Sequence, residues 1–134
     1  MPEEQYTKKE LTFKGKTADE LQSLDVREFA KMVPSRNRRN ILRNFQKLEN
    51  FISRAKEKQS KNKKIKTHNR SLVVVPQMVG MQIQIYNGKS FVPVEIEGEM
   101  LGHKLGEFAP TRARIMHSKS GVGATKGSKA KSKK

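Results

Sequence analysis

Four arginines crowd into about two helical turns, and no acidic residue lies among them. They are Arg36, Arg38, Arg39 and Arg43. Guanidinium groups donate paired hydrogen bonds to phosphate oxygens, so this cluster suits a phosphate backbone. A charge run is often only a solvated face, but the whole chain carries 29 Lys and Arg against 13 Asp and Glu, a net charge of +16. Because such a surplus repels itself until a polyanion neutralises it, we expect these arginines to contact a polyanion.

The residues that could catalyse a reaction or hold a metal are not arranged for either task. The histidines are His68, His103 and His117. They lie 35 and 14 residues apart, the chain has no cysteine, and the spacing matches no zinc motif. His103 suits contact with a phosphate or a base better than the role of general base. Glu95, Glu97 and Glu99 fit solvated charge near a strand end better than an acid–base pair. We therefore expect no enzymatic activity, no metal and no cofactor.

The basic residues fall into two blocks that flank a nearly neutral, apolar centre. The first block spans residues 31–70, and the second spans residues 112–134, where no acidic residue occurs. Composition and patterning predict four parts: a leader at 1–16, a basic helical region at 17–64, an α/β core at 65–110 that forms one domain with the helices, and a basic extended tail at 111–134. The tail has no aromatic residue and repeats Gly, Ser, Ala and Lys, so we expect it to order only on a partner.

The first block predicts helices with one apolar face. Thr17 to Glu20 forms a capping box at the start of a helix that is interrupted near residues 23–25. Pro34 suits the first turn of another helix, and Asn44 suits a break because Asn tolerates the left-handed conformation. After this break, apolar residues recur at three- and four-residue steps and predict a helix ending near Lys58. They are Phe45, Leu48, Ile52 and Ala55.

The centre of the chain predicts a small sheet. Leu72–Val75 is short, β-branched and stopped by a proline, which indicates a buried strand. Asn87-Gly88 is a strong signal for a two-residue hairpin loop, in which Ile83 faces Val92. One face of this hairpin is apolar, and Pro93 confines its strand to an edge or a bulge. Since the helix and the sheet each have one apolar face to bury, together they predict a two-layer α+β body.

These patterns indicate a binding protein without fixing the nucleic acid. The longest aliphatic run is far shorter than the ~20 residues of a membrane-spanning helix, and we expect no membrane association and no signal peptide. The sequence shows no helix-turn-helix, zinc-finger or basic-zipper pattern, nor the aromatic motif of the common single-strand RNA module. A DNA-compacting protein and an RNA-processing enzyme therefore stay open beside a structural RNA-binding protein.

Several stretches in the second half resemble the family of small-subunit ribosomal protein nineteen. Three of them are Lys66-Thr67-His68-Asn69-Arg70, Val75-Pro76-Gln77-Met78-Val79-Gly80 and Tyr86-Asn87-Gly88-Lys89-Ser90-Phe91-Val92-Pro93-Val94. The most specific is Met100-Leu101-Gly102-His103-Lys104-Leu105-Gly106-Glu107-Phe108-Ala109-Pro110-Thr111-Arg112. The helical part at 17–58 and the ending at 121–125 are similar to the archaeal and eukaryotic branch of the family. Residues 59–65 and 126–134 have no firm counterpart.

The resemblance implies a structural constituent of the head of the small ribosomal subunit, in the cytoplasm, with basic N-terminal helices packed on a mixed three-stranded sheet. It implies binding to small-subunit rRNA beside ribosomal protein thirteen, near large-subunit bridge elements, with the tail extending toward the tRNA-binding side. The RNA contacts that it implies are Lys66, Thr67, His68, Arg70, Lys89, His103, Lys104, Arg112 and Arg114. Gly102 and Gly106 are expected to let the backbone turn or approach RNA closely.

Overall fold

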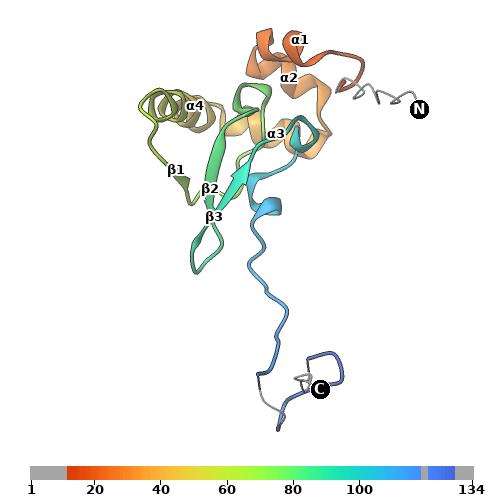
Figure 1. Ribbon diagram of the computed structural model, residues 1–134. Helices are drawn as coiled ribbons and strands as arrows, with labels where there is room; N and C mark the ends of the chain where they lie inside the picture. Colours follow the sequence, from red (N-terminus) through yellow and green to blue (C-terminus); the bar gives the residue numbers. More distant parts are fainter. Residues whose placement is uncertain (1–11, 119–120, 129–134) are drawn as a thin grey trace, which may run out of the picture.

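The computed structural model describes residues 12–118 and 121–128, so most of the predicted leader and residues 129–134 of the tail lie outside it. In this part of the chain, four helices precede a three-stranded sheet (Figure 1). The helices are α1 (Ala18–Ser23), α2 (Val26–Met32), α3 (Ser35–Arg43) and α4 (Phe45–Ser60). The strands are β1 (Ile65–Thr67), β2 (Gln82–Tyr86) and β3 (Phe91–Glu95). Short 3-10 helices occur at Pro76–Met78, Gly98–Met100 and Leu105–Phe108.

Local capping sets the helix boundaries near their predicted positions. The Thr17 amide donates a hydrogen bond to the Glu20 carboxylate at 3.2 Å, which is one half of a capping box. The predicted interruption follows, and the Asp25 side chain accepts a hydrogen bond from the Val26 amide at 2.8 Å where α2 begins. Pro34 is the N-cap of α3.

The break between α3 and α4 falls at Asn44, as predicted, but its cause is different. Asn44 has a φ of -104° and a ψ of 20°, which is not the left-handed conformation. Its side-chain amide donates to the Asn40 carbonyl oxygen at 3.2 Å, so the chain changes direction without a positive φ. After the break, α4 runs to Ser60, slightly beyond the predicted end at Lys58.

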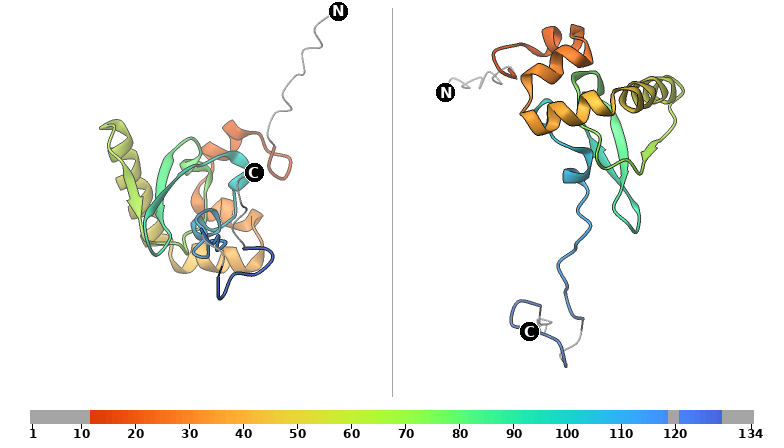
Figure 2. Two further views of the ribbon diagram at one scale, coloured as in Figure 1. Left: turned by 60° about the horizontal axis from the view of Figure 1, so that its bottom comes forward. Right: turned by 180° about the vertical axis from the view of Figure 1, so that it is seen from behind.

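The sheet has the strand order β1-β2-β3 and is mixed, as the family resemblance implies. β1 runs parallel to β2, and β2 runs antiparallel to β3. Pro93 lies on β3, an edge strand, where a missing ladder donor costs little. Together with the helices this sheet forms the predicted two-layer α+β domain, seen from two further sides in Figure 2.

The predicted register of the hairpin is wrong by two residues. Ile83 lies opposite Val94, and Ile85 lies opposite Val92. The loop therefore consists of residues 87–90 rather than of Asn-Gly alone. Because side chains alternate between the two faces of a strand, a shift of two residues leaves each side chain on its predicted face. The apolar face of the hairpin is thus the predicted one although its pairing is not.

Asn87 explains the longer loop. Its side-chain oxygen accepts hydrogen bonds from the amides of Lys89 at 2.9 Å and Ser90 at 2.7 Å. Gly88 has a φ of 94°, whereas Asn87 is not among the described residues with positive φ. A two-residue Asn-Gly turn of type I′ needs positive φ at both of its central positions. Here Asn87 caps a wider turn through its side chain, an alternative that Asn commonly offers.

Leu72–Val75 is buried as predicted, but it is not a strand of this sheet. Its four residues are at most 3% exposed. Their backbone pairs with the segment at 102–105: the Val74 amide donates to the His103 carbonyl oxygen at 2.8 Å. The third strand of the sheet is β1, which contains only one aliphatic residue, Ile65, and so lacks a periodicity signal.

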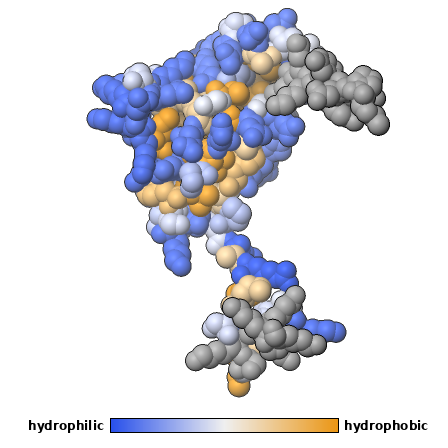
Figure 3. Space-filling model, in the orientation of Figure 1, coloured by the Kyte–Doolittle hydropathy of each residue, from blue (hydrophilic) through white to orange (hydrophobic). Residues whose placement is uncertain are grey.

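The core joins the helices to one face of the sheet. Leu48 and Ile52 of α4 and Ile83 and Ile85 of β2 are at most 3% exposed and belong to one apolar cluster. On the face of the body shown in Figure 3, hydrophilic residues surround the apolar ones. A core this small leaves much of the chain at the surface, where its charges are available to a partner.

The chain leaves the body after the 3-10 helix at Leu105–Phe108 (Figure 1). Ala109 is the last residue of the buried cluster, whereas Ile115 and Met116 are 70% and 68% exposed. Residues 110–118 and 121–128 contain no helix or strand. The described part of the tail therefore has almost no apolar packing of its own, and ordering on a partner stays a prediction.

Candidate nucleic-acid interface

Three of the four clustered arginines converge on one cavity beside α3. Arg36, Arg39 and Arg43 recur at three- and four-residue steps, which places them on one side of the helix. All three are exposed, and they line an open cavity of about 650 Å³. We call it the α3 cavity; its lining residues are Ser35, Arg36, Arg39, Asn40, Arg43, Asn44 and Lys104.

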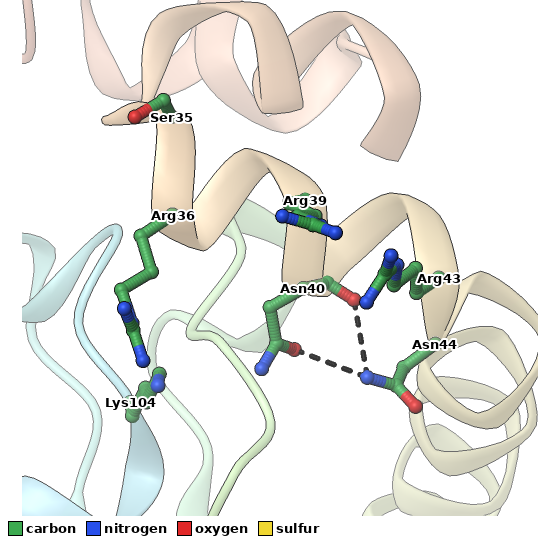
Figure 4. A pocket seen from close by; sticks show the side chains of 7 residues that line it. All are labelled: Ser35, Arg36, Arg39, Asn40, Arg43, Asn44 and Lys104. Atoms are coloured by element: carbon green, nitrogen blue, oxygen red, sulfur yellow. Dashed lines mark hydrogen bonds between the residues drawn. The ribbon is translucent and has the colours of Figure 1, made fainter.

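Lys104 reaches the α3 cavity from the segment that carries the strongest family resemblance. Figure 4 shows the Arg36 and Lys104 side chains pointing toward one another. The side-chain amide of Asn37 donates a hydrogen bond to the Gly102 carbonyl oxygen at 2.6 Å, which ties α3 to this segment. Gly102 has a φ of 80°, so it provides the turn expected of it. The hydrogen bond from Asn37 to Gly102 therefore helps to bring together cations that are far apart in the sequence.

The chemistry of the α3 cavity favours an anion of several charges. Its lining contains four cationic side chains, two carboxamides and one hydroxyl, and no carboxylate. Like charges held this close repel one another unless an anion lies between them. Guanidinium groups and amides supply many donors, which match the oxygens of successive phosphates.

Arg38, the fourth arginine of the cluster, is exposed but forms hydrogen bonds with its own chain. Its Nε donates to the Ala30 carbonyl oxygen at 3.1 Å, and its Nη2 donates to that of Lys31 at 2.9 Å. These carbonyls belong to the last turn of α2, whose final carbonyl groups have no partner within the helix. The Arg38 side chain thus caps α2, and it does not line the α3 cavity.

Arg70 and Thr67, both implied as RNA contacts by the family resemblance, also bond within the chain. The Arg70 guanidinium donates to three carbonyl oxygens, those of Tyr86 at 2.7 Å, Gly106 at 2.7 Å and Ala109 at 2.6 Å. Thr67 is 5% exposed, and its hydroxyl accepts from the Asn69 amide at 3.0 Å. Contact between these two side chains and RNA stays a prediction, but their hydrogen bonds give them a structural role.

Gly106 approaches the protein's own chain closely, whereas the sequence suggested either a turn or an approach to RNA. A Cβ at this position would lie 3.0 Å from both the Cβ and the carbonyl oxygen of Arg70. The Gly106 amide donates to that same Arg70 carbonyl oxygen at 2.9 Å. Glycine is therefore needed here so that two backbone segments can pack against each other.

His103 has a carboxylate partner that the sequence analysis missed. Its Nδ1 lies 2.8 Å from Glu107 Oε2, and the two side chains are 56% and 50% exposed. Sequence spacing gave no signal for this pair, because the segment is not an α-helix and His103 lies before a short 3-10 helix. The carboxylate orients the imidazole and leaves Nε2 for an external partner. Within residues 12–118 and 121–128, no group of three or more metal-binding side chains is present.

The remaining predicted contacts lie at the surface of other elements. Lys66 is on β1, His68 follows it, and Lys89 is in the hairpin loop; all three are exposed. Arg112 and Arg114 are exposed on the tail, where Arg114 donates to the Gly127 carbonyl oxygen at 3.1 Å. None of these five lines the α3 cavity. No helix in the described part of the chain is long and apolar enough to cross a membrane.

Comparison with known proteins identifies a family and a similar protein. Residues 35–117 match the model of a family described as Ribosomal protein S19. A protein named small ribosomal subunit protein uS19, from Methanococcoides burtonii, is 40% identical over 122 residues, which cover 91% of this chain and 88% of that protein. The matched residues include α3, the segment at 100–112 and the whole sheet.

Proposed function

The chain belongs to the ribosomal protein S19 family, and from this premise we propose that it is a structural constituent of the small ribosomal subunit that binds small-subunit rRNA through the α3 cavity. As a ribosomal protein it works in the cytoplasm, within the ribosome. One observation carries the proposal: four cations from two distant segments, Arg36, Arg39, Arg43 and Lys104, line one cavity that contains no carboxylate.

The contacts of the proposed interface differ from those implied by sequence alone. The α3 cavity supplies the central set, and His103, held by Glu107, lies next in sequence to Lys104. Lys66, His68, Lys89, Arg112 and Arg114 add exposed cationic or aromatic groups. Arg38, Arg70 and Thr67 are not part of this central set, because their side chains form hydrogen bonds within the chain, and their contact with RNA stays a prediction.

The finer parts of the proposal rest on the family resemblance. They are a position in the head of the subunit, contact with ribosomal protein thirteen, proximity to large-subunit bridge elements, and a tail directed to the tRNA-binding side. The exposed, basic and unpacked tail supports the last of these, since such a segment suits binding along a groove of phosphates. We include no catalytic step, although the pair of His103 and Glu107 makes an RNA-processing activity worth testing with His103→Ala.

The test is a binding measurement with the full chain and a transcript of the small-subunit head rRNA. The double variant Arg36→Gln/Arg39→Gln removes two cations from the α3 cavity. Its matched control, Lys56→Gln/Lys58→Gln, removes two exposed cations from α4. Each lost phosphate contact lowers the slope of log affinity against log salt by about 1, so we expect a decrease of about 2 for the cavity variant and a smaller change for the control.

The salt dependence of the unmodified chain is a second readout. If about 6–10 phosphates are neutralised, affinity falls roughly 10³–10⁵-fold between 50 and 200 mM salt. Equal losses in the cavity variant and its control would show that the α3 cavity is not the interface. Equal competition by duplex DNA would favour a DNA-compacting protein instead.

A further inference from the structure

The sheet has a second face that the core does not use. Strand alternation places Lys66, Gln84 and Pro93 in one row across the three strands, on the side opposite to the core. Lys66 and Pro93 are exposed and Gln84 is half-buried, whereas the core-facing Ile83 and Ile85 are 0% exposed. No element in the described part of the chain therefore covers this side, which we call the open sheet face.

Three aromatic rings meet at one end of the open sheet face. Tyr86 and Phe91 are directly opposed across β2 and β3, with ring centroids 5.1 Å apart. His68 follows β1, and its ring lies 4.5 Å from that of Tyr86 and 5.1 Å from that of Phe91. One ring thus lies at this end of each strand of the sheet. His68 is exposed and the other two are half-buried, so this ring cluster is open to a partner.

The surroundings of the ring cluster are polar and cationic. Lys66 Nζ lies 5.1 Å from the Phe91 ring centroid, and the exposed Lys89 occupies the adjoining hairpin loop. Gln82 and Gln84 present carboxamides on the same face, farther along β2. Aromatic faces, flanking cations and amides that can both donate and accept are the groups that hold single-stranded nucleic acid.

We propose that the ring cluster stacks an unpaired nucleobase of RNA, with Lys66 and Lys89 bound to the flanking phosphates. This inference rests on the proposed function and adds a second mode of contact, because the α3 cavity has no aromatic residue and can hold only phosphates or base edges. Since Lys66 lies over Phe91, the base stacks on His68 and Tyr86. Any base offers a π face, so the contact requires an unpaired nucleotide rather than a given sequence.

A nucleobase fits the ring cluster better than a second protein does. The core of a protein–protein interface is depleted of lysine and glutamate. Here Lys66 contacts one of the rings, and Glu95 lies on the same face of β3. Three rings amount to one or two stacking positions, which match the size of a nucleotide, and lysines beside them are placed for its phosphates.

The experiment compares a single-stranded 12-nucleotide RNA with a fully paired, blunt-ended RNA duplex of two separate strands, each bound to the full chain. His68→Leu/Tyr86→Leu removes both stacking rings but keeps apolar side chains, and His68→Phe/Tyr86→Phe keeps the rings. We expect the leucine variant to bind the single strand about 5- to 150-fold more weakly. Its binding to the duplex and its salt slope should stay near those of the unmodified chain, and the phenylalanine variant should bind both RNAs normally.

Photocrosslinking provides a readout that does not depend on a variant. The unmodified chain is irradiated with the same single strand carrying 4-thiouridine, and the adducts are mapped by mass spectrometry. We expect adducts on His68, Tyr86 or Phe91. Adducts confined to other residues, or a leucine variant that binds the single strand like the unmodified chain, would overturn the stacking proposal. The effect of Arg36→Gln/Arg39→Gln on binding to the head rRNA would then still decide the proposed function separately.

Discussion

At the scale of single residues, the arginines divide into two kinds. Arg36, Arg39 and Arg43 are exposed in the α3 cavity, whereas Arg38 and Arg70 bond to backbone carbonyl groups of their own chain. Sequence spacing cannot separate the two kinds, because a guanidinium binds a phosphate oxygen and a carbonyl oxygen with the same donors. What decides between them is the set of carbonyl groups that the fold leaves without partners.

Substitution of Arg70 tests the role of the arginines that bond to backbone carbonyl groups. Arg70→Lys keeps the charge, but one ammonium cannot reach the three carbonyl oxygens that the planar guanidinium joins. We expect the free energy of unfolding to decrease by about 3 kcal/mol, because buried acceptors lose their partners. Chemical denaturation measures this decrease. Arg36→Lys, on the exposed side of α3, is the control and should change stability by less than about 0.5 kcal/mol.

At the scale of elements, the sequence predicts structure where a pattern repeats. α4 is predicted by the spacing of Leu48, Ile52 and Ala55, and these residues are indeed its buried ones. The apolar face of the hairpin is predicted for the same reason. β1 is not predicted, because three residues are too few for a period and its pairing partner, β2, is distant in the chain. Leu72–Val75 shows the converse: its composition indicates burial, but its partner segment at 102–105 is set by the whole fold.

In the candidate site, too, local patterns could be predicted from the sequence and contacts between distant segments could not. The basic cluster on α3 is evident from local spacing, and Lys104 is implied only by the family resemblance. Their common cavity could not be predicted, since it depends on the contact of Asn37 with Gly102. The ring cluster was also missed, because His68, Tyr86 and Phe91 become neighbours only through strand pairing that the predicted register did not contain.

The hairpin loop offers a test at this scale. Asn87→Ala removes the acceptor that serves the amides of Lys89 and Ser90, and we expect a loss of about 1 kcal/mol in unfolding free energy. Asn87→Asp keeps an acceptor oxygen and should retain most of the stability. Hydrogen exchange of the two amides provides a local readout. Unchanged protection in Asn87→Ala would show that the side chain does not set the four-residue loop.

At the scale of the whole molecule, the basic tail and the apolar core are separate parts of the chain. The buried cluster and the half-buried residues packed against it draw on every helix and strand as far as Ala109, but on none of the described residues beyond it. The segment at 112–134 carries eight of the basic residues and no acidic one. Its charges therefore raise the self-repulsion of the free protein without adding to its core, and a polyanion is what compensates them.

Deletion of residues 112–134 tests whether the tail contributes to RNA binding without contributing to the stability of the fold. The net charge falls from +16 to +8, because the deleted segment holds eight Lys and Arg. Arg70 keeps all three of its acceptors, since the last of them is the carbonyl oxygen of Ala109. We therefore expect the free energy of unfolding to stay the same or to rise slightly, as repulsion within the chain decreases.

RNA binding by the truncated chain should respond in the opposite direction. Affinity for the head rRNA falls, and the slope of log affinity against log salt becomes shallower by up to about 7, the value for eight lost phosphate contacts. The residual binding should still depend on Arg36 and Arg39, because the α3 cavity remains intact. Circular dichroism and binding at several salt concentrations measure both effects. A truncated chain that unfolds would show that the tail belongs to the folded body, and one that binds with unchanged affinity would show that its cations do not contact the RNA.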